Sequence, residues 1–388
     1  MLRFFVVLVG FFFALGGMAQ EGQITIGERK TIYSEILGED RPFIVGIPPN
    51  YDENKKYSLL FVLDGDYHFI STYGVVEYLS KRFLIPDMIV VAIPNTNRVR
   101  DLTPTHTLIN FQGEQDSSLL QSGGGEQFLR FIEEELIAYM DSNYSLSNLE
   151  VLVGHSWGGL IATHGFFDRD GAIDKFIAID PSYWWDQQYF PQLASRYDFG
   201  AFPDRRKLFI SASSLDIEEQ QGPCCLHRNS IDLFYATLKN QMFSSDRFSL
   251  SYFEDEDHAS VPVPSLYYGL KAVFSDYKLE NPNEQDPYEI ERHYESYAKE
   301  NNAQLLPSED LIRNVGLYQQ YAEEDLQAAK ELYEYNYTSY PNSWKACYTL
   351  GALLLELNEK ERAKALLQKS ITINPYAEEV KQLLKQLE

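Results

Sequence analysis

The sequence is poor in cysteine. Three cysteines occur among 388 residues, as an adjacent pair, Cys224 and Cys225, and a distant Cys347. This arrangement matches neither a disulfide framework nor the paired spacing of a zinc site. We therefore predict no metal site and assign the cysteines no function.

Basic residues are also scarce. Lysine and arginine total 33 against 57 aspartates and glutamates, which gives a formal net charge of −24. Such a charge disfavours binding to nucleic acid or to anionic membrane surfaces. Apolar residues make up 44% of the chain, enough for a sizeable core, and the length favours two or more domains.

The N-terminal apolar run, from Phe4 to Leu15, is too short to span a membrane. It follows a positive charge at Arg3, and Gly17-Met18-Ala19 after it has the form of a cleavage signal, with small residues at positions 17 and 19. It lacks a polar face, and no cysteine near the cleavage point offers a site for lipid attachment. We predict a secretory signal peptide over residues 1–19, and export to the periplasm or the extracellular space.

The stretch around Ser156 carries the strongest motif. An apolar run at residues 151–153 indicates a buried strand, and apolar spacing after Gly158 indicates a helix. Between them, GHSWG at residues 154–158 is a G-x-S-x-G sequence. A serine hydroxyl is a weak nucleophile, so it must project from a sharp turn where a histidine can reach it. The alternative is a turn serine between packed elements.

Short apolar strands alternate with helices through the first 277 residues. This alternation is typical of a mainly parallel sheet covered by helices on both faces, and it predicts a doubly wound α/β fold. In such sheets the site lies beyond the carboxyl ends of the strands. The expected strands are 41–48, 57–63, 88–93, 151–153, 175–179, 208–212 and 248–253, and the expected helices are 69–80, 126–140, 231–242 and 265–277.

Two candidate partners of Ser156 follow expected strands. Asp216 comes just after residues 208–212, and His258 just after residues 248–253. The chain order Ser156, Asp216, His258 is that of an α/β-hydrolase triad. His258 would take the serine proton and return it to the leaving group, while Asp216 would orient the imidazole. The alternative acids are Glu218 and Glu219, and the histidines expected to be structural are His68, His106, His155, His164, His227 and His293.

A triad also requires an oxyanion hole. One donor is expected to be the backbone N–H of Trp157, the residue after the nucleophile. The other is expected from the loop after residues 57–63, where Gly65 and Asp66 allow close backbone approach. A plain turn at residues 64–66 is the alternative.

Several motifs in order resemble the esterase branch of the α/β-hydrolases, which includes ferric-siderophore esterases, esterase D-like enzymes and feruloyl or acetyl-xylan esterases. They are LDG at 63–65, RVRDLTP at 98–104, GGGEQF at 123–128, GHSWG at 154–158, DPSYWW at 180–185 and DH at 257–258. The resemblance implies hydrolysis of a carboxylic ester through a serine acyl-enzyme, without metal or cofactor. It carries over Ser156 and His258. The acid varies in this branch between Asp and Glu, and some siderophore esterases resemble a Ser–His dyad.

Two stretches at strand ends are candidates for binding substrate. Tyr183, Trp184 and Trp185 follow the strand 175–179 and could stack on a catechol, a ferulate ring or a sugar; packing beneath a lid is the alternative. Arg98 and Arg100 follow the strand 88–93 and could bind an acidic ligand. Pairing with Asp101 to hold the loop is their alternative role.

The composition changes after Tyr277. We divide the chain into the signal peptide, an α/β-hydrolase domain over residues 20–278, a polar linker over 279–300 and an all-α helical-repeat domain over 301–388. Ala329 and Pro341 recur as Ala363 and Pro375, at the period of about 34 residues of a tetratricopeptide unit. This predicts two helical hairpins within 310–375 and a capping helix over 377–387. Two repeats are few for an independent solenoid, so the segment should lean on the hydrolase domain or on a second copy of the chain.

These observations favour a secreted serine esterase acting on a small-molecule or glycan ester, with a siderophore ester and a feruloyl or acetyl-xylan ester as open substrates. No stable membrane insertion is expected, and the C-terminal helices could support a homo-oligomer or a protein partner. A non-catalytic binding protein on a hydrolase scaffold is the second hypothesis. Acyl transfer, which uses the same residues, is the third.

Overall fold

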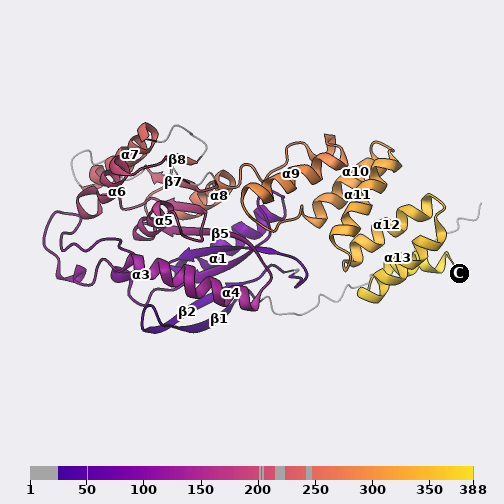
Figure 1. Ribbon diagram of the computed structural model, residues 1–388, viewed down its shortest axis with the longest axis horizontal. Coiled ribbons are helices and arrows are strands. Elements are labelled where there is room, and N and C mark those ends of the chain that lie inside the picture. The colour runs from indigo at the N-terminus through magenta and orange to yellow at the C-terminus, as the bar shows by residue number, and fades with distance from the viewer. Residues whose placement is uncertain are drawn as a thin grey trace, which may run out of the picture.

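The computed structural model describes residues 25–387 apart from positions 50, 201, 203–204, 215–222 and 242–246 (Figure 1). The predicted signal peptide lies outside the described residues, as do Asp216, Glu218 and Glu219. Within the described part of the chain, no helix is both long enough and apolar enough to cross a bilayer.

One sheet of eight strands organises the first two thirds of the chain. Its order is β1-β2-β4-β3-β5-β6-β7-β8. The first pair is antiparallel, β2 is antiparallel to β4, and all remaining neighbours are parallel. The predicted α/β-hydrolase fold with a mainly parallel sheet is therefore confirmed. The strands are β1 (Glu28–Ser34), β2 (Glu39–Gly46), β3 (Tyr57–Leu63), β4 (Met88–Ile93), β5 (Leu146–His155), β6 (Lys175–Ile179), β7 (Lys207–Ser213) and β8 (Phe248–Phe253).

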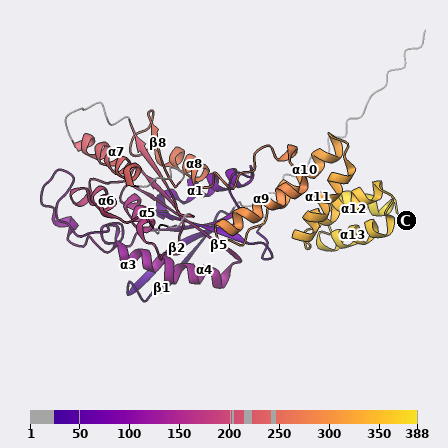
Figure 2. The ribbon, with the colours of Figure 1, turned by 45° about the horizontal axis from the view of Figure 1, so that its top comes forward.

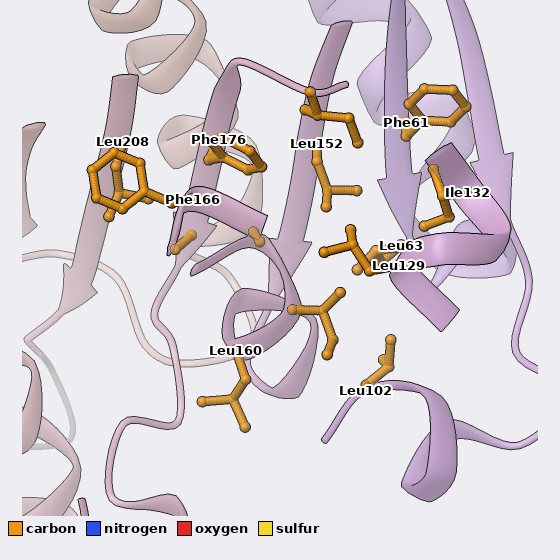
Figure 3. Close-up of a cluster of buried hydrophobic side chains, with 14 of the residues drawn as sticks. Phe61, Leu63, Leu102, Leu129, Ile132, Leu152, Leu160, Phe166, Phe176 and Leu208 are labelled. Atoms are coloured by element: carbon orange, nitrogen blue, oxygen red, sulfur yellow. The ribbon is translucent and has the colours of Figure 1, made fainter. Parts of the chain in front are cut away.

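The central strands are buried on both faces, so alternate residues of one strand enter two different cores. Phe61 of β3 faces the core shown in Figure 3, where Leu152 and Phe176 of neighbouring strands meet Ile132 and Leu160 from the covering helices. The helices on that face are α3 (Gly125–Arg130), a π-helical turn (Phe131–Leu136), α4 (Ile137–Asn143), α5 (Trp157–Phe167), α6 (Trp185–Arg196) and α7 (Pro223–Gln241).

The opposite face carries α1 (Gly65–Ser80) and α8 (Pro262–Val273). Leu60 and Val62 of β3 point to this side and share a core with Leu266 of α8. The two faces together explain why the central strands lack a polar alternation, since neither of their sides meets water.

Residues 279–300, predicted as a linker, contain helix α9 (Pro287–Glu300). Asp286 caps its N-terminus by accepting from the backbone N–H of Glu289, and Pro287 occupies the first turn. Tyr294 and Tyr297 are buried, with ring centroids 5.2 and 5.3 Å from the ring of Tyr277. The second half of the expected linker is thus a helix packed on the hydrolase domain.

The remaining helices form two antiparallel hairpins and a short final helix, as predicted. A small residue occurs where each hairpin crosses: a Cβ at Gly316 would lie 2.4 Å from the ring of Tyr333, and one at Gly351 would lie 3.0 Å from Leu367. The helices are α10 (Glu309–Tyr321), α11 (Leu326–Ser339), α12 (Trp344–Glu356), α13 (Lys360–Ile373) and α14 (Glu378–Lys385).

The helical hairpins extend from one end of the sheet domain (Figures 1 and 2), and α10 joins its core. Polar contacts reinforce the junction. Lys55 pairs with Glu309 at 2.8 Å, Lys175 donates to Asn301 at 2.6 Å, and the backbone N–H of Gln304 donates to the carbonyl of Ser147 at 2.7 Å. The hydrolase domain therefore supports the short repeat array, as expected for so few repeats.

The junction lies at the amino ends of the strands. Lys55 precedes β3, Ser147 is the second residue of β5 and Lys175 is the first residue of β6. The motif residues Ser156 and His258 instead follow the carboxyl ends of β5 and β8. The helical segment is therefore attached at the edge opposite the candidate site.

Truncating Ile312 of α10 tests this packing. Its side chain is fully buried in the core shared with the sheet, so Ile312→Ala should lower the free energy of unfolding by about 2–5 kcal/mol. Ile373→Ala, at an exposed position of α13, is the matched control and should cost far less. Urea denaturation of both variants measures the difference. Equal effects would show that α10 does not share the hydrolase core.

Candidate active site

Ser156 lies on a strained turn between β5 and α5. Its backbone angles, φ 58° and ψ −115°, are unusual for a residue with a side chain. The turn is held by its N–H, which donates to the carbonyl of Ile179 at 2.9 Å. A Cβ at position 154 would lie 2.1 Å from the carbonyl oxygen of Gly158, so the first glycine of the motif is required by close backbone approach. These features are those of a nucleophile elbow.

His258 lies in the loop after β8, where its Nδ1 is 2.7 Å from Oδ2 of Asp180. Asp180 follows β6 directly and is fully buried. Its carboxylate also accepts from the N–H of Ser213 at 3.1 Å and from the Ser213 hydroxyl at 2.8 Å. A buried carboxylate that accepts from Nδ1 holds the proton on that nitrogen and leaves Nε2 to act as a base.

The carboxylate beside His258 is thus Asp180, whereas the sequence predicted Asp216. Asp216 lies outside the described residues. Both aspartates follow adjacent parallel strands, β6 and β7, so either could reach a histidine at the same sheet edge. Asp180 opens the DPSYWW motif, and its position directly after an expected strand was the signal that could have identified it.

Ser182 connects the serine turn to the segment that carries Asp180. Its N–H donates to the carbonyl of Ser156 at 3.2 Å, and the two hydroxyl oxygens are also 3.2 Å apart. Asp180, two residues earlier, bonds His258. The ring of His155, which precedes the nucleophile, lies 4.5 Å from the ring of His258. Ser156, His258 and Asp180 therefore converge at one edge of the sheet.

Burial and neighbouring charges set the protonation states here. Burial raises the pKa of Asp180, but the nearby imidazole of His227 and the hydrogen-bonded imidazole of His258 outweigh it and hold that pKa well below its usual range. Burial lowers the pKa of His155 to about 3, with further lowering by the rings of His258 and His68. Asp180 is consequently anionic and His155 neutral at any working pH.

The depressed pKa of His155 makes stability depend on pH. Its unfolded pKa is about 6.5, so below that pH the unfolded chain binds a proton that the folded chain excludes. This group's share of stability is complete above pH 6.5 and is lost as pH falls toward 3. We expect about 2 kcal/mol of the loss between pH 7.5 and pH 5 to come from His155. His155→Leu should remove that part of the slope in chemical denaturation; an unchanged slope would contradict the assignment.

Two helix N-termini meet beside the nucleophile. Trp157 and Gly65 are the first residues of α5 and α1, so their N–H groups have no acceptor within their own helices. A Cβ at Gly158 would lie 3.5 Å from Leu63, which shows that the start of α5 packs against the end of β3. Gly65 in turn is pressed against β4, since its Cβ would lie 2.6 Å from the nitrogen of Ile93. The arrangement suits an oxyanion hole built from Trp157 and from Gly65 or Asp66.

The two candidate arginines differ in position. Arg98 donates from Nε to Asp64 at 2.7 Å, and its guanidinium lies over the Trp157 ring, 5.1 Å from the centroid, next to the serine turn. Arg100 pairs with Glu39 at 2.6 Å and with Asp101 at 2.7 Å. These pairs favour the loop-holding role for Arg100. Arg98 is also paired, since its Nη2 donates to Asp64 as well, but it stays a candidate for contact with substrate because it lies beside Trp157 and is 36% exposed.

The three candidate aromatic residues also differ in their exposure to solvent. Tyr183 is fully buried, with its hydroxyl 2.6 Å from the hydroxyl of Thr163, and Trp185 is buried with Nε1 donating to Thr105 at 3.1 Å. Their burial favours the packing alternative. Trp184 is partly exposed, and its ring centroid is 4.7 Å from that of Phe111 in the loop after α2 (Arg98–Asp101). This pair, which the sequence did not suggest, is the aromatic surface that a substrate could reach.

Comparisons with known proteins agree with this architecture. Residues 34–178 match the model of the family described as "Putative esterase", and residues 320–387 match a tetratricopeptide repeat. The siderophore triacetylfusarinine C esterase of Aspergillus fumigatus is 35% identical over 190 residues, 40% of this chain and 60% of that protein. The siderophore enterobactin esterase of Emericella nidulans is 26% identical over 278 residues, 61% of this chain and 91% of that protein.

Solved structures with a similar fold cover a larger part of this chain than the curated relatives do. An IroE-like serine hydrolase from Shewanella oneidensis has a TM-score of 0.70 and 25% identity, covering 80% of this chain and 98% of that one. An uncharacterised protein from Capnocytophaga ochracea, at 14% identity, shares the fold with a TM-score of 0.60 over 93% of this chain and 99% of that one. Over its sheet domain the chain therefore resembles the esterase branch of the α/β-hydrolases, and its C-terminal segment matches a tetratricopeptide repeat.

Proposed function

We propose that this protein is a serine esterase that hydrolyses a siderophore ester through an acyl-enzyme on Ser156. One observation carries the proposal: the strained Ser156 turn is bonded to the segment whose Asp180 accepts from His258. A binding protein on the same scaffold would have no use for the strain at Ser156 or for an anion buried behind an imidazole.

The reaction follows from this geometry. Nε2 of His258 takes the proton of Ser156 as Oγ attacks the ester carbonyl, and the N–H groups of Trp157 and Gly65 stabilise the oxyanion. His258 then gives the proton to the departing alcohol, which leaves the acyl group on Ser156. A water molecule, deprotonated by His258, then attacks the acyl carbon; the bond to Ser156 breaks, His258 returns the proton to Oγ, and the acid leaves. Asp180 keeps the imidazole in the reactive tautomer and stabilises its cationic form.

The substrate class rests on similarity and on the residues around the serine. Both fungal relatives are named siderophore esterases. Arg98 beside Trp157 offers a cation near the serine, and Trp184 with Phe111 offers an aromatic surface. A siderophore ester that carries aromatic, anionic groups would use both. The predicted export of the chain would bring the enzyme to such ligands outside the cytoplasm.

A panel of esters tests this choice. The full chain is incubated with ferric and iron-free enterobactin, a feruloyl sugar, an acetylated xylan fragment and a short p-nitrophenyl ester, and products are followed by liquid chromatography with mass detection. We expect kcat/KM for a siderophore ester to exceed that for the glycan esters by at least about 100-fold. Faster cleavage of the feruloyl or acetylated glycan would make the protein a carbohydrate esterase.

A further inference from the structure

A second histidine lies against the catalytic carboxylate. His227, in the first turns of α7, has Nε2 3.3 Å from Oδ1 of Asp180, while His258 bonds the other oxygen, Oδ2. Nε2 of His227 is shielded from solvent and has no hydrogen-bond partner of good geometry among the described residues. The proposed ester hydrolysis requires only one imidazole on Asp180, so it leaves His227 without a role.

The three groups have the spacing of metal ligands. One ligand atom each from Asp180, His227 and His258 lie within 4.8 Å of one another. Zinc binds imidazole nitrogen and carboxylate oxygen at about 2.0–2.2 Å, so neighbouring ligands of a tetrahedral site are about 3.3 Å apart. The separation of 3.3 Å between Nε2 of His227 and Oδ1 of Asp180 has that value, whereas the 2.7 Å hydrogen bond between His258 and Oδ2 would lengthen when the ion binds. Ser213, which donates twice to Asp180, would fix the orientation of the carboxylate, as outer-shell partners do in metal sites.

We propose that Asp180, His227 and His258 form an inhibitory site for Zn²⁺, with water as the fourth ligand. The ion binds Nδ1 of His258, and the single proton of the neutral imidazole moves to Nε2 through solvent. Nε2 then carries a hydrogen and cannot accept the proton of Ser156. The bond between His258 and Asp180 is replaced by two bonds to the metal. Binding of the ion does not depend on the proposed esterase activity, whereas inhibition by the ion rests on that activity.

Calorimetric titration of the full chain with zinc chloride, in a buffer that does not chelate zinc, tests the site. Wild type should bind one ion, and His227→Gln should bind it at least about 10-fold more weakly, since even outer-shell changes cost that much. His293→Gln, a histidine on α9 that bonds the carbonyl of Tyr277, is the matched control and should bind within about twofold of wild type. Thermal melts verify that the variants fold.

Two further readouts keep the test decisive. In wild-type crystals soaked with zinc, an anomalous peak should lie between the three side chains, whether or not His227→Gln folds. In the p-nitrophenyl assay, the zinc concentration for half-inhibition should rise in His227→Gln by the same factor as the dissociation constant, and EDTA should restore activity. Equal zinc binding by wild type and His227→Gln, or a peak elsewhere, would overturn the proposal. A protein that binds zinc here but cleaves no ester would overturn the esterase assignment and leave the site intact.

Discussion

Ser156→Ala should lower kcat/KM for ester hydrolysis by roughly 10⁴- to 10⁶-fold with little change in KM, because it removes the nucleophile and leaves the binding surface intact. The residual rate would come from the oxyanion hole and from substrate binding alone. Initial rates on a p-nitrophenyl ester and on the best siderophore ester measure the loss.

Ser182→Ala is the natural control, since its hydroxyl lies 3.2 Å from that of Ser156. We expect a modest loss there, because Ser182 orients the serine turn chiefly through its backbone N–H, which the substitution keeps. A larger loss in Ser182→Ala than in Ser156→Ala would show that the nucleophile is Ser182 and that the assignment to Ser156 is wrong.

Asp180→Asn should lower kcat by about 10⁴-fold, the size of effect found when the acid of a serine triad becomes an amide. An asparagine amide donates to Nδ1 of His258, which forces the ring proton onto Nε2 and removes the base. The shape of the site barely changes, so KM should stay close to that of wild type. Steady-state kinetics across pH 6–9 separate this effect from misfolding.

Asp216→Asn is the matched variant, because Asp216 is the acid that the chain order of the triad predicts. We expect it to retain most of the wild-type kcat. A severe loss in Asp216→Asn with a mild loss in Asp180→Asn would restore Asp216 as the acid. Mild losses in both would indicate a Ser–His dyad, in which no carboxylate is essential.

The contrast between these two aspartates shows which parts of the candidate site could be predicted from the sequence. Ser156 was identifiable because the glycine spacing, the strand before it and the helix after it are all local. His258 was predicted because it follows the last core strand, and the structure places it beside Asp180. The partner of His258 was harder to choose, because Asp180 and Asp216 follow adjacent parallel strands; only the position of Asp180 directly after β6 favoured it.

The direction of individual side chains was a second feature that the sequence did not predict. Tyr183, Trp184 and Trp185 are consecutive, yet only Trp184 is partly exposed. The sequence shows that an aromatic cluster follows β6, but it does not show which of these rings enter the core. Helix α9 was missed for another reason. Pro282, Pro287 and the many polar residues of this segment resemble a linker, and the buried tyrosines of α9 gain their partner, Tyr277, only in the folded chain.

The central claim, an activated nucleophile at Ser156, is tested most directly by a phosphonate that reacts only with activated serines. Intact-mass measurement followed by peptide mapping should show one adduct per wild-type chain, on Ser156, and none on Ser156→Ala. Asp180→Asn should react far more slowly. An adduct on another serine, or no adduct on a folded wild-type chain, would contradict the account.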